Sequence, residues 1–165
     1  MDMPDRKRAG GSVADVLPRI VGAFVAGAFS VVAFHQLAWG LFYVTGVSPV
    51  VPYPIRPVPP FGVPRVVSQM FWGGLWGIVL MSLLRTRRGT RYWLLLFAMG
   101  FGFIVPSLVG LFVVPLLKGL PPGASQQTGQ PEMIIQLVGT FANLAWGFGT
   151  ALILRLLPPK FEFRA

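Results

Sequence analysis

Four long apolar stretches constrain the fold of this chain more than any other feature of its sequence. They cover about residues 20–44, 66–84, 92–117 and 133–157. A helix of such a length crosses about 30 Å of hydrocarbon. Only 12% of the 165 residues are charged and 54% are hydrophobic, which is outside the range of soluble domains. Because backbone polar groups inside a bilayer must be satisfied within the segment, the sequence predicts an all-α integral membrane four-helix bundle, with residues 1–165 forming one domain.

An internal repeat relates the two halves of the chain. Phe71–Gly77 matches Phe141–Gly147, and Gly40–Val44 matches Gly110–Val114, both at an offset of 70 residues without a gap. The match predicts a tandem duplication of a two-helix hairpin, with units of about residues 20–85 and 90–155. Both copies would cross the membrane in the same sense, so a pseudo-twofold axis along the membrane normal should relate them.

The basic residues predict how the helices are oriented. Eleven of the 14 Lys and Arg residues lie in the N-terminal tail up to Arg19, in the turn 85–91 or at the C-terminal end, whereas the other two loops hold three. Since basic residues concentrate on the cytoplasmic side, we expect both termini, including the tail 1–18, and the turn in the cytoplasm. The arginines of the turn are expected to contact anionic lipid headgroups: Arg85, Arg87, Arg88 and Arg91.

Composition also suggests a location. Arginine outnumbers lysine 11 to 3, and Gly, Ala and Pro are abundant, which favours a GC-rich bacterial genome and hence a multi-pass protein of the bacterial inner membrane. Ala26–Ala28 resembles the cleavage site of a signal peptide, the alternative interpretation of the first stretch. Because the apolar run continues to Val44, we favour an uncleaved membrane span.

Four amide side chains are the main polar groups within the apolar stretches. Helical spacing predicts that all of them point into the bundle: Gln36, Gln69, Gln136 and Asn143. Interhelical hydrogen bonds that stabilise the bundle are one explanation. The other is a neutral pocket in the outer leaflet for a quinone-like or lipid-like ligand with a carbonyl or hydroxyl group. The sequence favours the first explanation.

Small residues predict which helices approach most closely. Gly73 and Gly77 share one face of the second stretch, and Gly139 and Gly147 share one face of the fourth. Lipid gives no hydrophobic drive for helices to associate, so small residues that let backbones approach mark the packing faces. We therefore expect the second and fourth helices to form the core, and Pro106 to kink the third.

The set of reactive side chains argues against catalysis. The chain has no cysteine and one histidine, and its five acidic residues lie outside the apolar stretches or at their edges. His35 is predicted on a face that looks toward lipid or a partner, and Val105 takes the equivalent place in the second copy, so the repeat supplies no pair of haem ligands. His35 is a candidate contact to a partner or ligand. No catalytic, cofactor-binding or metal-binding residue is predicted.

The stretch 48–64 contains seven prolines and is predicted to be a stiff, extended loop outside the cell. The leading hypothesis is a non-enzymatic structural, accessory or assembly subunit that acts through its helix faces and this loop. Membrane lipids, a membrane protein or a second copy would be its partners, and no nucleic acid is expected. The alternative is a small transporter, channel or lipophilic-ligand-binding protein that uses the amide pocket.

Overall fold

Four long helices dominate the computed structural model of the chain, which describes residues 13–86, 89–124 and 132–157. Each is long and apolar enough to cross a membrane. They span Val16–Val44, Arg65–Arg85, Arg91–Leu117 and Met133–Leu156. These bounds agree closely with the four apolar stretches, so the prediction of a mainly helical chain with four candidate membrane spans is confirmed.

Two of the four helices change pitch near the same end of the bundle. The first consists of α1 (Val13–Ser30), the wider turn η1 (Val31–His35) and α2 (Gln36–Val44). The third consists of α4 (Arg91–Leu108), η2 (Val109–Val113) and α5 (Val114–Leu117). The second and fourth, α3 (Arg65–Arg85) and α6 (Met133–Leu156), are uninterrupted. Pro106 lies inside α4, and the wide turn η2 begins three residues later.

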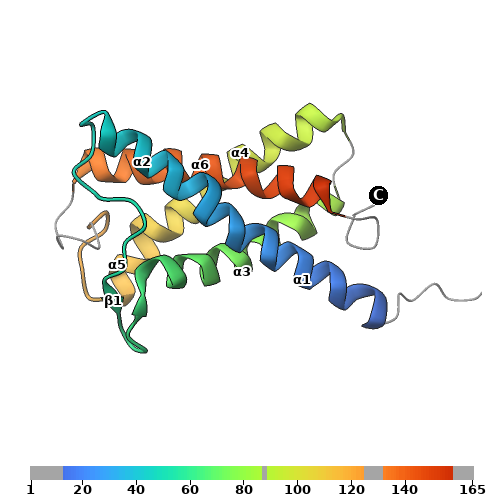
Figure 1. The fold of residues 1–165 in the computed structure, drawn as a ribbon, viewed down its shortest axis with the longest axis horizontal. Helices are drawn as coiled ribbons and strands as arrows, with labels where there is room; N and C mark the ends of the chain where they lie inside the picture. The colour runs from blue at the N-terminus through green and yellow to red at the C-terminus, as the bar shows by residue number, and fades with distance from the viewer. Residues whose placement is uncertain (1–12, 87–88, 125–131, 158–165) are drawn as a thin grey trace, which may run out of the picture.

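The helices form a ring in the order α1, α3, α4 and α6. The first helix packs along both α3 and α6, and α4 packs along α6 (Figure 1). The fourth side of the ring, between α3 and α4, is wider and is filled by large side chains, including Trp76 against Phe101. The second and fourth spans are therefore diagonal to each other, not the paired core that the glycines suggested. Each uses its glycines against a different helix.

The α1–α3 interface is a contact between backbones. A Cβ atom added to Gly27 would collide with the carbonyl oxygen of Gly73, and one on Gly77 would lie 2.5 Å from the carbonyl oxygen of Ala23. Glycine is required at these positions because any side chain would push the two helices apart.

The α4–α6 interface is built in the same way. A Cβ atom on Gly102 would collide with the carbonyl oxygen of Asn143, and one on Gly147 with that of Ala98. Ala23 and Gly27 in α1 thus have the places that Ala98 and Gly102 have in α4, an offset of 75 residues. In α3 and α6, the residues that make these contacts keep the 70-residue offset of the sequence repeat. The contact residues of α1 and α4 are therefore five positions, just over one helical turn, away from where the sequence repeat would place them.

Trp146 fastens α6 to α1 at the middle of the bundle. Its indole Nε1 donates to the carbonyl oxygen of Gly27 at 2.9 Å, and Ser30 Oγ donates to the carbonyl oxygen of Trp146 at 2.7 Å. Both side chains are buried, with Trp146 only 2% exposed. The indole reaches almost to Gly73 of α3, so Trp146 occupies the centre of the ring.

The proline-rich loop between α2 and α3 folds back as a short hairpin. Its strands are β1 (Pro57–Val58) and β2 (Val63–Pro64), antiparallel with Pro57 opposite Pro64. The hairpin leads directly into α3, and the loop lies across the end of the bundle beside α5 (Figure 1). We call this end the loop end. The opposite end, where α3 ends at Arg85 and α4 begins at Arg91, is the arginine-turn end.

Candidate functional site

A hydrogen bond between Gln36 and Gln69 links two spans near the loop end. Gln36 Nε2 donates to Gln69 Oε1 at 2.9 Å, and the Gln36 side chain is 1% exposed. Gln36 begins α2 directly after the wide turn, and Gln69 lies in the second turn of α3. A buried amide that donates to another amide satisfies both groups without placing a charge in the bundle.

Gln36 also holds the proline-rich loop. Its Oε1 accepts a hydrogen bond from the backbone N–H of Tyr53 at 2.7 Å, and the Tyr53 hydroxyl donates to the carbonyl oxygen of Val32 at 3.1 Å. Tyr53 has a φ of 54°, the left-handed region that costs energy for a residue with a side chain. These two hydrogen bonds hold the strained residue in place.

His35 lies beside this network and is half-buried. Its Nδ1 is 3.3 Å from Gln36 Nε2, and Arg65 is close enough to act on it electrostatically. The structure thus places His35 next to Gln36 at the loop end, rather than on a face turned fully outward. The prediction that it contacts a partner stays a prediction.

The other two amides serve different contacts. Gln136 Nε2 donates to the carbonyl oxygen of Gly123 and so ties the loop that follows α5 to α6. Asn143 Nδ2 donates to Ser107 Oγ at 3.0 Å, and that hydroxyl lies 3.5 Å from the carbonyl oxygen of Gly102. Pro106 cannot donate to that carbonyl, so Ser107 and Asn143 compensate for the missing backbone bond. The four amides therefore do not gather in one pocket.

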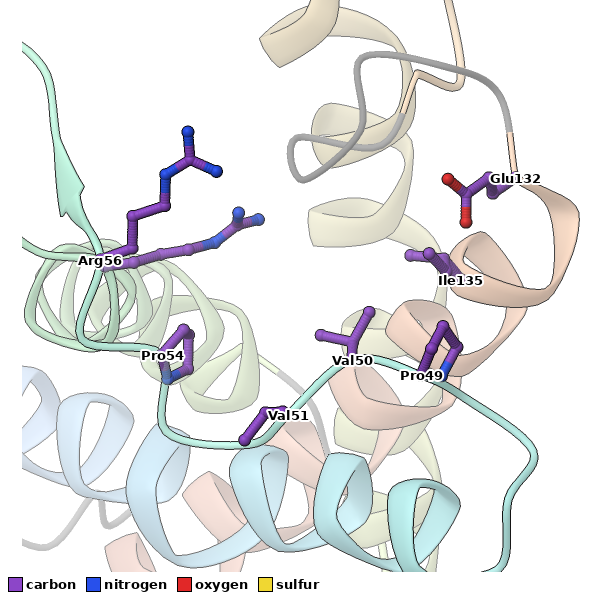
Figure 2. Close-up of a pocket in the computed structure, with 8 residues that line it drawn as sticks. Pro49, Val50, Val51, Pro54, Arg56, Glu132 and Ile135 are labelled. Carbon is purple, nitrogen blue, oxygen red and sulfur yellow. The ribbon is translucent and has the colours of Figure 1, made fainter.

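A hollow of about 390 Å³ opens at the loop end instead. Figure 2 shows the loop on one side of it and the start of α6 on the other, with Arg56 and Glu132 on opposite walls. None of the four amides lines it. Its lining is apolar except for three charged side chains: Pro49, Val50, Val51, Pro54, Ile135, Arg56, Arg65 and Glu132.

The charges of the hollow are arranged by the hairpin and two helix starts. Arg65 N donates to the carbonyl oxygen of Arg56 at 3.0 Å, which fixes the two arginines side by side, close enough for their charges to repel. Lys118, just beyond α5, is also near: partial burial lowers the pKa of its ammonium, and the charge of Arg65 lowers it further. Glu132 precedes the first turn of α6.

At the arginine-turn end, two of the predicted lipid-contacting arginines are described. Arg91 is exposed, with Nη2 3.1 Å from the Tyr92 hydroxyl and its guanidinium 5.0 Å from the centre of that ring. Arg155 Nη2 donates to the carbonyl oxygen of Arg91 at 2.6 Å. Arg85 ends α3 and is exposed. Arg87 and Arg88 lie outside the described residues.

Three of the four predicted packing glycines make close contacts between helices, and the fourth does not. Gly73, Gly77 and Gly147 make the backbone contacts described above, whereas Gly139 is in ordinary contact with Trp39, 3.6 Å from an added Cβ. Sequence reasoning overlooked three partners: Tyr53, Ser107 and Trp146. The recurrence of Trp76 as Trp146 in the repeat was the one signal for them, since hydroxyls and loop backbone show no periodic pattern.

No protein-family model matches the chain, and neither the curated proteins nor the solved structures show a similarity to it.

Proposed function

We propose that the chain is a non-enzymatic protein of the bacterial inner membrane that serves as an accessory or assembly subunit and docks a partner protein through its proline-rich loop. The basic residues support an orientation with both termini in the cytoplasm and the loop end outside. Similar backbone contacts in the α1–α3 and α4–α6 pairs support a tandem duplication of one hairpin.

The observation that carries the proposal is a loop that is held firmly yet exposes large apolar side chains. Gln36 and Val32 anchor Tyr53, and the backbone N–H of Val66 donates to the carbonyl oxygen of Pro54 at 2.9 Å. Phe61 is nevertheless 86% exposed and Ile55 79% exposed. Fixing each backbone residue costs about 1 to 2 kcal/mol of conformational entropy. A fixed loop with apolar side chains at its surface is typical of an interaction site.

The alternative, a small transporter, channel or lipophilic-ligand-binding protein that uses an amide pocket, has less support. It requires the amides to face a ligand, but Gln36, Gln136 and Asn143 each donate a hydrogen bond to another described residue and Gln69 accepts one from Gln36. None of the four lines the hollow. The hydrogen bonds of the amides are those expected of structural links between helices and loops.

Photo-crosslinking tests the docking role. A photo-reactive amino acid in place of Phe61 or Ile55 should give one discrete protein adduct in intact cells. The same amino acid in place of Val79, which is exposed on α3 away from the loop, should give lipid adducts alone. Loosening the loop by Gln36→Leu, or more mildly by Tyr53→Phe, should weaken the adduct. Equal adducts at all three positions, or an adduct indifferent to both loop variants, would contradict the proposal.

A further inference from the structure

The fold brings together the few basic residues that lie on the predicted outer side of the membrane. Arg56, Arg65 and Lys118 are the three Lys and Arg residues in the two loops predicted to lie outside. They are far apart in sequence, yet the first two line the hollow and the third lies within electrostatic range of Arg65. Basic residues outside the cell are disfavoured by the preference of Lys and Arg for the cytoplasmic side. Their meeting in one place therefore suggests that they have a role at this site.

The hollow has two charged walls of opposite sign. The hairpin and the start of α3 supply Arg56 and Arg65, whose charges repel each other. Among the described residues, no side-chain hydrogen bond or ion pair neutralises either guanidinium. Glu132 stands on the opposite wall (Figure 2). The N-terminus of α3 begins at Arg65 and adds partial positive charge beside the arginines.

Adjacent guanidinium groups whose donors have no protein partner among the described residues match a phosphate group, which accepts paired hydrogen bonds from arginine. A ligand with negative charge alone would place part of it near the Glu132 carboxylate. A ligand that carries a phosphate and an ammonium group a few atoms apart satisfies both walls.

The surroundings of the hollow favour a lipid as the source of this headgroup. Its floor is made of proline, valine and isoleucine side chains. On the first turns of α6, next to Ile135 of the floor, Met133, Ile134 and Leu137 are exposed and form an apolar surface for acyl chains. A volume of about 390 Å³ is within the range of small-molecule sites, roughly 300 to 1,000 Å³.

We propose that the hollow binds the headgroup of a zwitterionic phospholipid of the outer leaflet, with the phosphate between Arg56 and Arg65 and the ammonium against Glu132. Such a lipid bridges the hairpin and α6, which share no direct ion pair among the described residues. The outer leaflet in this inference rests on the orientation proposed above, whereas binding of the headgroup does not depend on whether the loop docks a partner protein.

Native mass spectrometry of the purified full chain tests the proposal. The probes are phosphatidylethanolamine, phosphatidylglycerol and soluble phosphoethanolamine, each added to detergent-solubilised protein. The wild type should retain phosphatidylethanolamine in preference to phosphatidylglycerol. Arg56→Gln, at an exposed loop position, should weaken that binding by about tenfold or more, since charge-assisted hydrogen bonds are lost. The matched control Arg155→Gln, whose guanidinium donates to the carbonyl oxygen of Arg91 at the arginine-turn end, should leave it unchanged.

Glu132→Gln separates ammonium recognition from phosphate recognition. This variant should still bind phospholipid but should lose the preference for phosphatidylethanolamine over phosphatidylglycerol. Equal binding of the two lipids to the wild type, or an unaltered preference in Glu132→Gln, would overturn the proposal. Retention of soluble phosphoethanolamine with no retained lipid would also overturn it, because the apolar surface of α6 would then play no part.

Discussion

Gln36 is the residue on which the most contacts at the loop end depend. One amide group links α2 to α3 through Gln69, holds the backbone of Tyr53 and lies beside His35. It is buried and follows directly on the wide turn η1, which sets the direction of its side chain. Wide turns of this kind are frequent at functional sites, and here the turn positions the anchor of the loop.

At the residue scale, Gln36→Leu should destabilise the protein and free the loop. The change leaves the Tyr53 N–H and the Gln69 amide without their partner, which costs about 1 to 3 kcal/mol. Chemical unfolding in detergent measures the loss, and limited proteolysis within residues 48–64 measures the loop. Ser82→Ala is the control, since its hydroxyl is exposed and bonds within its own helix. Unchanged stability and unchanged proteolysis would show that Gln36 does not anchor the loop.

The amides themselves could be predicted from the sequence, but their partners could not. An amide in an apolar stretch stands out by polarity, and Gln36 and Gln69 lie on facing helices as expected. Tyr53 and Gly123 belong to loops, whose paths depend on turns that no periodicity records. The hollow was missed for the same reason: its walls come from a loop, a hairpin and a helix start.

At the element scale, the closest approach of α1 to α3 is a contact between backbones at glycine positions. The same holds for α4 and α6. The sequence showed where the small residues are but not which helices they bring together. Glycines on two helices are compatible with several pairings in a four-helix ring. The choice depends on bulky residues such as Trp76 and Phe101, which keep α3 and α4 further apart.

Gly77→Val tests this interface. The added side chain meets the carbonyl oxygen of Ala23 and the backbone of Gly27, so we expect a destabilisation of about 1 to 3 kcal/mol, typical of overpacking. Gly100→Val is the matched control because an added Cβ there has nothing within 4 Å. Thermal unfolding of both variants in the same detergent gives the comparison. An equal shift in the two variants would mean that helix propensity, not the contact, determines the effect.

At the scale of the whole molecule, charge asymmetry is the basis for the orientation. The four apolar stretches determined the helices well because length and hydropathy alone define a candidate span. Orientation follows from loop charges, a property of the membrane environment rather than of internal packing. It therefore needs a measurement in the membrane.

Cysteine labelling provides that measurement, because the chain has no cysteine of its own. Phe61→Cys, 86% exposed at the hairpin, should react in intact cells with a thiol reagent that does not cross membranes. Thr86→Cys, exposed at the end of α3, should react only after the cells are opened. The reverse pattern would place the loop end and the hollow in the cytoplasm.

The two backbone interfaces have a consequence for biosynthesis. Each joins helices that follow one another along the chain, so the first hairpin can close while the ribosome is still making the second. Backbone atoms lose no rotamer freedom on contact, which favours early closure. The hydrogen bond from Trp146 to Gly27 spans 119 residues and cannot form until the final helix has been inserted. We therefore expect the contact of Trp146 with α1 to form last, after both hairpins have been inserted.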